Sequence, residues 1–436
     1  MRKLLAAGTV LMVVAAGMLT CSSSRGSIEF APRMAVGPRD ARVFAGNSLQ
    51  FHTHVVGELD LSDVRWSVVG PGSIDDRGLY RAAEVPSSAD VVANAGHGLA
   101  DSVSVQTVKP PLPDEPLILA TCYSDGTVNV DDERSHVFLG ALSVGGRAAG
   151  ITVDPGADRA VFVVESQMVA IDLRTMHWQV STPIAGVRLS EVTRLAFGFY
   201  GATDNNADAG QPGVRIYRID ASGMPRLVTS AAAGETPEGI VAEADGRTFY
   251  VTNINGNSLM RFSLAPSGRA RLLVTGKTAA RPFGIALDPV SHELFVADND
   301  TSVVNGARAR PGLERFDATT LRRIGPMIST GSGSSLPLGV AVDPPTRRVF
   351  VTNEGDQNVV VFALPAMRRI AVLATGLTPW LPSLDPQSDR LYVPNARDDT
   401  ISIFDARSLR TIAAALPTCS YPTSVTVAHA SRGAHS

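Results

Sequence analysis

The sequence predicts an all-β protein, a β-sandwich followed by a closed ring of repeated four-stranded β-sheets. Two observations lead to this prediction. In the N-terminal part apolar and polar residues alternate, which is the period of a half-buried strand. The C-terminal part repeats a hairpin pattern, with an Asn- or Asp-rich turn after an apolar run, that begins at Arg247, His292, Arg347 and Asp389. Because a lone hairpin cannot bury both of its faces, the repetition predicts sheets that cover one another.

Composition and charge narrow the class of protein. The chain has 436 residues, of which 44% are hydrophobic and 19% are charged, as expected of a folded protein with more than one domain. The formal net charge is −3, which gives no electrostatic basis for binding nucleic acid. We therefore expect no nucleic-acid partner.

The N-terminus predicts export. A basic pair precedes an apolar run over residues 4–20, which Cys21 closes, and this length suits a secretory signal peptide better than a membrane span. The Cys resembles the lipidated residue of a bacterial lipoprotein signal, although Thr20 replaces the smaller residue usual there. An ordinary signal peptide is the alternative. We expect a signal peptide at 1–21, a tether at 22–30, and a periplasmic or cell-surface protein anchored by its lipid.

Residues 31–108 are expected to form the sandwich. In the segment SLQFHTHVV, Leu49 and Phe51 fall on one face of a strand and His52 falls on the other. A lone Trp66 suits a sandwich core. The Trp-containing strand, the Gly-Ser-Ile-Asp turn and the following Gly-Leu-Tyr resemble a bacterial Ig-like domain, without the core disulfide of antibody domains because no Cys pair lies here.

A Pro-rich connector at 109–116 separates this domain from the repeat. Each repeat opens with Pro-x-Gly, continues as an apolar strand and reaches an Asp-Pro turn. The clearest copies are PFGIALDP from Pro282 and PLGVAVDP from Pro337. Related segments begin at Ala148, Pro237 and Pro379. The spacing is typical of four-stranded propeller blades.

Two stretches, residues 250–253 and 350–353, spell or nearly spell Tyr-Val-Thr-Asn. The chain thus resembles the YVTN-type β-propeller family over about 300 residues. That resemblance implies the fold and says little about function. The spacing places six blades at 147–186, 187–234, 237–277, 282–331, 337–376 and 379–417. Strands from both chain ends would build a seventh, giving a seven-bladed β-propeller over 117–430 and a tail at 431–436.

The cysteines fit this closure. If Cys21 is lipidated, Cys122 and Cys419 remain, and an even pair in an oxidising compartment predicts a disulfide. Cys419 precedes the inner strand of the closing blade and Cys122 ends the neighbouring strand. Because neighbouring strands are antiparallel, these two ends meet. Two buried free thiols are the alternative.

In a propeller, the loops between blades and inside each central hairpin emerge on one face, which is the usual binding site. Here that face would gather the residue after each Pro and the polar residues of the turns. A ring of Asn and Glu oxygens could hold a hard cation, and metal-dependent propeller lactonases are similar. The alternative is that Asn only stabilises the turns. The candidate ligand-binding residues are Glu238, Asn253, Phe283, Asn299, Asn353, Trp380 and Asn395.

A second, weaker metal candidate is the loop TDNNADAGQPG. Asp204, Asn206 and Asp208 alternate as in a calcium loop, but Gly210 comes one place late and Arg215 stands where Glu is expected. A solvated loop is the alternative. The sequence has no nucleophile elbow, covalent-haem motif, phosphate loop or dinucleotide fingerprint.

The leading functional hypothesis is a non-catalytic binding or scaffolding protein of the cell envelope, since no convergent acid/base set is visible. Its partner would be an envelope protein, a glycan or a small molecule, and it would touch the membrane only through its lipid. No catalytic residue and no cofactor is expected, with Ca²⁺ or another divalent cation as the alternative. The main rival is a metal-dependent hydrolase of the lactonase kind. A periplasmic redox accessory protein is a second rival, which rests on fold analogy alone.

Overall fold

The computed structural model describes residues 33–56, 64–96, 98–279, 281–300, 303–304, 307–308 and 311–429. Apart from two short 3-10 turns, η2 (Pro155–Ala157) and η3 (Ala196–Gly198), the regular structure of this part of the chain is β-strand, which confirms the all-β prediction. None of its helical pieces is long and apolar enough to cross a membrane. The predicted signal peptide, the tether and Cys21 lie outside the described residues.

The N-terminal domain has one core between its sheets. Phe51 and Tyr80 are fully buried there and contact edge to face, while His52 is exposed, as the alternation predicted. Its resemblance to Ig-like domains and its predicted limits stay predictions. The strands are β1 (Arg33–Gly37), β2 (Ala41–Phe44), β3 (Ser48–Gln50), β4 (His52–Val56), β5 (Arg65–Val69), β6 (Ser73–Ile74), β7 (Leu79–Arg81), β8 (Ser87–Gly96) and β9 (Leu99–Val108).

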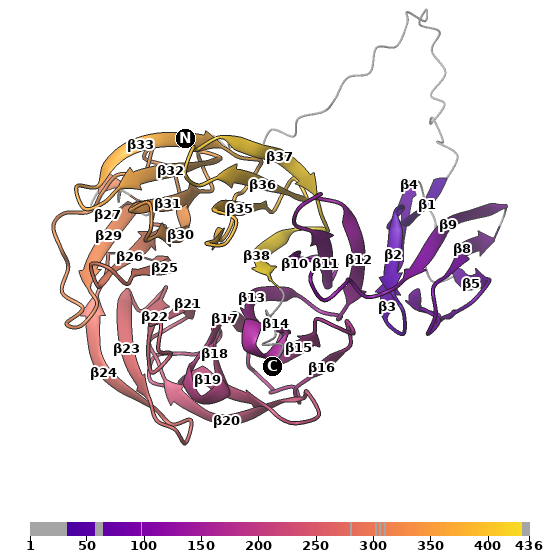
Figure 1. Cartoon of the computed structure of the whole chain (residues 1–436), viewed down its shortest axis with the longest axis horizontal. Coiled ribbons are helices and arrows are strands. Elements are labelled where there is room, and N and C mark those ends of the chain that lie inside the picture. Colours follow the sequence, from indigo (N-terminus) through magenta and orange to yellow (C-terminus); the bar gives the residue numbers. More distant parts are fainter. Residues whose placement is uncertain are drawn as a thin grey trace, which may run out of the picture.

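The rest of the chain forms sheets arranged radially around one axis, in sequence order, which is a β-propeller (Figure 1). Within each sheet the strands are antiparallel neighbours, the first innermost. The sheets are β13 (Ala148–Asp154), β14 (Arg159–Val164), β15 (Gln167–Asp172), β16 (Trp178–Val180); β17 (Leu189–Arg194), β18 (Phe199–Asp204), β19 (Pro212–Ile219), β20 (Pro225–Ala232); β21 (Pro237–Ala242), β22 (Thr248–Asn253), β23 (Ser258–Leu264), β24 (Ala270–Lys277); β25 (Pro282–Asp288), β26 (Glu293–Asp298), β29 (Gly312–Asp317); β30 (Pro337–Asp343), β31 (Arg348–Asn353), β32 (Asn358–Ala363), β33 (Arg368–Ala374); and β34 (Ser383–Asp385), β35 (Arg390–Asn395), β36 (Thr400–Asp405), β37 (Thr411–Pro417). The short strands β27 (Val303–Val304) and β28 (Ala307–Arg308) form a separate hairpin between β26 and β29.

Both ends of the repeat close the ring in one sheet, as predicted. The C-terminal strand β38 (Pro422–Ala428) pairs antiparallel with β10 (Leu117–Cys122), which is followed by β11 (Thr127–Asp132) and β12 (Phe138–Ser143). The expected disulfide joins Cys122 and Cys419 across a sequence separation of 297, with their Cα atoms 5.8 Å apart. Because both ends of the repeat share this sheet, the ring of blades is closed.

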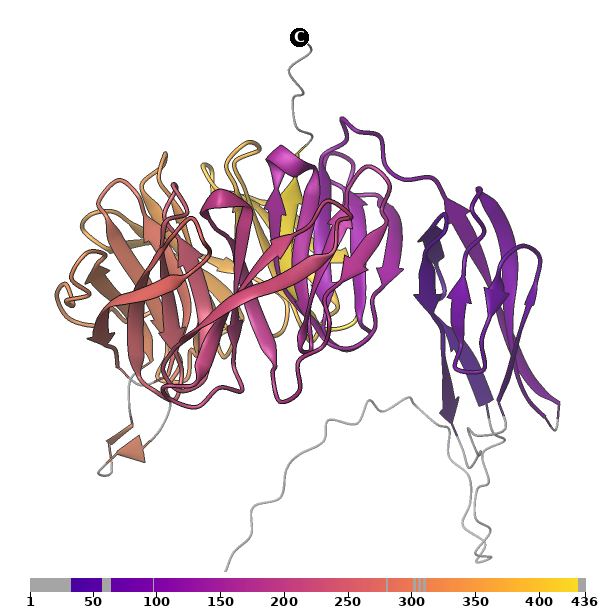
Figure 2. The same cartoon turned by 90° about the horizontal axis from the view of Figure 1, so that it is seen from below.

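The sequence did not reveal how the two domains are joined. The outer strand β12 pairs in parallel with β2 of the N-terminal domain, Ala141 opposite Val43, so that one sheet runs from the closing blade into that domain (Figures 1 and 2). Phe44, at the end of β2, is fully buried among propeller residues such as Leu142 and Val128. The shared sheet and this buried aromatic ring fix the N-terminal domain against the propeller rim.

Candidate functional site

The threonine of the Tyr-Val-Thr-Asn stretch joins its blade to a neighbouring one. The Thr252 hydroxyl accepts a hydrogen bond from the Gly239 N–H at 2.9 Å and donates one to the Phe283 carbonyl at 2.7 Å. A Cβ added to Gly239 would lie 2.6 Å from that carbonyl oxygen, so glycine is required there. The residue after each Pro, such as Glu238, therefore lies on the face where the inner strands begin. We call this the loop face.

Glu191 occupies the glycine position in the preceding blade. Its N–H donates to the Thr203 hydroxyl at 3.1 Å, and that hydroxyl donates to the Glu238 carbonyl at 2.6 Å, which is the bonding pattern of Gly239 and Thr252 one blade on. The strand register agrees. Leu189 pairs with Asp204 in one blade as Pro237 pairs with Asn253 in the next, so Glu191 and Gly239 occupy equivalent positions. Within the described part of the chain, the Glu191 carboxylate has no hydrogen bond or ion pair.

Glu238 lies next to Glu191 and is held firmly. Its side chain is 6% exposed and accepts hydrogen bonds from the Ser190 hydroxyl at 2.5 Å and from the Asn205 amide at 3.3 Å. Burial raises the pKa of Glu238, while these two hydrogen bonds and the charge of Arg188 oppose that rise. The network favours one fixed orientation of this carboxyl group.

The pKa of Glu191 is raised more strongly. Burial is the largest cause, and the negative charge of Glu238 adds to it, so the pKa of Glu191 lies well above the usual range of a glutamate. Two adjacent, desolvated carboxyl groups are an arrangement that enzymes use to raise a glutamate pKa. We refer to Glu191 and Glu238 as the glutamate pair.

Aromatic side chains from several blades form a continuous arc on the loop face. Phe283 and Trp380 contact edge to face with ring centroids 5.8 Å apart, Trp380 and Tyr421 are 6.3 Å apart, and Tyr421 and Tyr123 are 6.1 Å apart. All four side chains are partly exposed. The guanidinium of Arg147 lies 5.4 Å from the centroid of the Tyr123 ring. We call these four rings the aromatic arc.

Arg188 connects the aromatic arc to the glutamate pair. Its guanidinium donates a hydrogen bond to the Tyr123 hydroxyl, and its charge acts on Glu238. The loop face therefore carries apolar ring surface, a cation and two acids in sequence around the axis. This combination could position a ring-shaped polar substrate and carry out acid–base chemistry on it.

The predicted asparagines of the ring do not join this group. Asn253, Asn353 and Asn395 are each 0% exposed. The side-chain oxygens of Asn253 and Asn395 accept N–H groups of Gly234 and Gly376 at 2.9 and 3.1 Å, in the loops that lead into their blades. The Asn353 amide donates to the Thr330 carbonyl at 3.1 Å and to the Asn358 side chain at 2.9 Å. These bonds are of the turn-stabilising kind, and a binding role for the three asparagines stays a prediction.

Of the other predicted positions, three take part in the groups described above and one does not. Phe283 and Trp380 are brought into contact, and Glu238 joins the glutamate pair. Asn299 is half-buried, and its N–H donates to the Arg281 carbonyl at 3.1 Å. Its binding role stays a prediction.

The candidate calcium loop is occupied by protein groups. Asp204 is 2% exposed and accepts a hydrogen bond from the Arg215 guanidinium at 2.8 Å and from the Arg188 N–H at 2.9 Å. The Asn206 amide donates to the Gly186 carbonyl at 2.9 Å, and Asp208 is exposed. The Arg215 guanidinium would compete with a cation for the Asp204 carboxylate, and the metal role of this loop stays a prediction.

Glu191 is the site residue that sequence reasoning missed. The second blade lacks the Pro-x-Gly signature, so its inner strand was placed by spacing alone. Aligning LSEV at 189–192 with PEGI at 237–240 would have revealed a glutamate in place of the glycine. The sequence signal for Glu191 is thus an acidic residue at the position where other blades have glycine.

No protein-family model matches the chain, and no curated protein matches it in sequence. Solved structures share its fold. A Lactobacillus plantarum protein superposes with a TM-score of 0.58 at 15% identity, covering 72% of this chain and 99% of its own. A Bacteroides fragilis protein provisionally named a 6-phosphogluconolactonase gives 0.57 at 11% identity, covering 73% and 99%. The periplasmic gluconolactonase of Pseudomonas aeruginosa gives 0.56 at 13% identity, covering 72% and 99%. Likeness at these identities shows the fold, a β-propeller.

The leading functional hypothesis from the sequence, a non-catalytic binding or scaffolding protein, was wrong. It rested on the absence of a convergent acid/base set, and the tertiary structure brings Glu191 and Glu238 together. Proteins with this fold named as lactonases also agree with the rival hypothesis of a hydrolase. The physical reason for the error is that one member of the pair stands in a blade without a recognisable signature.

Proposed function

We propose that this chain is an exported hydrolase of the lactonase kind, with its active site on the loop face of the propeller. The observation that carries the proposal is the glutamate pair, because Glu191 combines a raised pKa with a carboxylate that the fold does not use. The aromatic arc beside it offers ring surface on which a sugar-like substrate can stack. The lactonases among its structural neighbours support the reaction class.

In this proposal Glu191 is the general base. It takes a proton from water as the water oxygen attacks the lactone carbonyl, and a tetrahedral oxyanion forms. Collapse of that intermediate breaks the ring C–O bond, and the proton on Glu191 passes to the departing alkoxide, which leaves a hydroxy acid. A carboxylate whose pKa is raised by burial is a stronger base than an ordinary glutamate, which suits it to both transfers. Glu238 is a positioning residue, since its charge keeps the pKa of Glu191 high.

Arg188 and the aromatic arc have supporting roles. The Arg188 guanidinium lies between Tyr123 and the glutamate pair, so it can stabilise the developing oxyanion. Trp380 and Phe283, in edge-to-face contact, present a corner of ring surface to the substrate. Both are residues that the sequence predicted for ligand binding.

A metal-dependent version of this chemistry needs oxygen ligands that converge. In the predicted set of Glu238 with the asparagine ring, the Asn253 and Asn395 oxygens already accept backbone N–H groups from the loops that lead into their blades. The described His, Cys, Asp and Glu side chains make one close group of three, Cys122, Asp125 and Cys419, and its cysteines form the disulfide. The proposed mechanism therefore uses side chains alone.

Export belongs to the same proposal. A disulfide between Cys122 and Cys419 is what an oxidising compartment permits, and the signal-like N-terminus agrees with it. One structural neighbour is a periplasmic enzyme. Lipidation at Cys21 remains part of the proposal, to be checked by the mass of the mature N-terminal peptide.

The test is hydrolysis of δ-gluconolactone by the full chain at pH 6.5, followed as lactone loss above the spontaneous rate. We expect catalysis by the unaltered chain and a loss of about 100-fold or more in Glu191→Gln, the range of general acid–base contributions. Glu235→Gln is the matched control, because Glu235 is exposed on the same face. Absence of hydrolysis across δ- and γ-lactones of hexonic acids, or full activity in Glu191→Gln, would contradict the proposal.

A further inference from the structure

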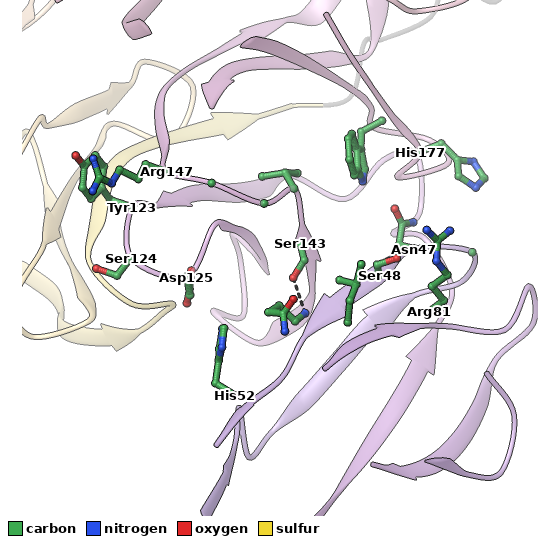
Figure 3. A pocket seen from close by; sticks show the side chains of 17 residues that line it. Asn47, Ser48, His52, Arg81, Tyr123, Ser124, Asp125, Ser143, Arg147 and His177 are labelled. Carbon is green, nitrogen blue, oxygen red and sulfur yellow. Dashed lines mark hydrogen bonds between the residues drawn. The ribbon is translucent and has the colours of Figure 1, made fainter. Parts of the chain in front are cut away.

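A pocket lies between the two domains, away from the glutamate pair. It has a volume of about 960 Å³, at the upper end of the range for ligand pockets. One wall comes from the N-terminal domain and the other from the closing blade and the blade after it (Figure 3). Its lining includes Arg81, Tyr123, Arg147, His177 and Trp178.

The walls of the pocket are fixed. Besides the sheet shared by β12 and β2, the Gln50 N–H donates to the Ser143 hydroxyl at 2.7 Å across the pocket floor. At the rim the two domains touch closely, since a Cβ added to Gly46 would lie 3.2 Å from Nε2 of His177. A ligand would therefore meet a pocket that is already formed, which lowers the entropic cost of binding.

The pocket carries positive groups at both ends, of which Arg147 also forms a partly exposed ion pair with Glu165 at 3.8 Å. The side chains of Arg81 and His177 have no hydrogen bond or ion pair among the described residues, and both lie at one end (Figure 3). Arg147 lies at the other end over the Tyr123 ring. Asp125 is the acid in the lining, and its two oxygens already accept the N–H groups of Thr127 and Ser420 at 3.1 and 2.9 Å.

Between the charged ends the lining suits a carbohydrate. Ser48, Ser124 and Asn47 supply hydroxyl and amide groups, while Tyr123 and Trp178 supply aromatic faces. Aromatic rings with polar groups at their edges match sugar rings, which have an apolar face and a hydroxylated rim. Purely inorganic anions would use the arginines and leave the aromatic surface unused.

We propose that this interdomain pocket binds a short acidic oligosaccharide, with carboxylate groups at its two ends held by Arg81 and Arg147. The pocket shares Tyr123 with the aromatic arc but contains neither member of the glutamate pair, so this proposal does not depend on lactone hydrolysis. The N-terminal domain would then contribute half of a binding site rather than act as a simple stalk.

The test is calorimetric titration of the full, disulfide-bonded chain with trigalacturonate, against maltotriose as the neutral control. We expect saturable, salt-sensitive binding of trigalacturonate, a loss of at least tenfold in Arg81→Gln, and no change in Arg271→Gln, an exposed arginine on an outer strand of the propeller. Glu191→Gln should bind normally while losing hydrolysis, and Arg81→Gln should hydrolyse normally.

Three outcomes would overturn the proposal. Equal binding of maltotriose would remove the role of charge, and equal binding of triglutamate or tripolyphosphate would remove the carbohydrate class. Unchanged affinity in Arg81→Gln, with the pocket intact by thermal melting, would place the ligand elsewhere.

Discussion

Glu191 stands in its blade where Gly239 stands in the next, and each donates its N–H to a threonine hydroxyl. At this position the hydrogen bond that the blade needs is made by the backbone N–H alone. The glutamate side chain is an addition that the framework does not need, and its burial beside Glu238 is unfavourable for the charged form. A costly side chain at a position that works with glycine is typical of a functional residue.

Replacing Glu191 by Gly should therefore separate stability from activity. We expect Glu191→Gly to melt at the same temperature as the unaltered chain or higher, because a partly buried acid without a hydrogen-bond partner among the described residues is removed, and to lose lactone hydrolysis by about 100-fold or more. Differential scanning calorimetry and the lactone assay measure the two effects. A marked drop in melting temperature would show that Glu191 serves the fold.

Glu238→Gln should change the pH dependence of catalysis. The negative charge of Glu238 contributes to the raised pKa of Glu191, so its removal lowers that pKa. Because a general base works when deprotonated, the rising limb of kcat/KM should move to lower pH in the variant. A pH–rate profile from pH 4 to 8 measures this shift, and an unshifted rising limb would contradict the role assigned to Glu238.

The disulfide should stabilise the closed ring. Cys122–Cys419 links the two strands that close the ring across a separation of 297, and removing a native disulfide typically costs about 2 to 5 kcal/mol. We expect Cys122→Ser/Cys419→Ser to unfold at lower denaturant concentration. Reductant should destabilise the unaltered chain to the same level and leave the double variant unchanged, so a further effect on the double variant would point to another cause.

Asp131 should make stability depend on pH. It is 1% exposed, both carboxylate oxygens lack hydrogen-bond partners among the described groups, and burial raises its pKa to about 7. The folded state therefore holds the proton more tightly than the unfolded state. This contribution is fully present below about pH 4 and is lost as the pH rises through 7.

Asp131→Asn removes that titration. We expect the variant and the unaltered chain to be similar in stability near pH 4, and the variant to be more stable at pH 8 by on the order of 4 kcal/mol, since one pKa unit corresponds to about 1.4 kcal/mol. Denaturant titrations across this pH range measure the difference. The adjacent Asp132 is the contrast, because its pKa is lowered by hydrogen bonds from Ser135, and Asp132→Asn should be destabilising at pH 8.

The sequence by itself determined the propeller, its closure by both chain ends and the Cys122–Cys419 disulfide. These follow from periodic patterns, because every blade packs against its neighbours in the same way and therefore needs similar residues at the same positions. It also placed Phe283 and Trp380 on the loop face, since the position after each Pro is set by strand register. The sequence could not tell whether the Asn253 side chain bonds its own loop or faces a ligand, because an Asn at a turn can do either.

The tertiary structure alone decided the two sites. Glu191 and Glu238 are 47 positions apart in the chain and meet because their blades are neighbours. Arg81 and Arg147 come from different domains and share a pocket because β2 continues the sheet of β12. Repetition in a sequence reveals contacts that recur in every blade, whereas a site depends on the contacts that occur once, and those are fixed by how the pieces pack in space.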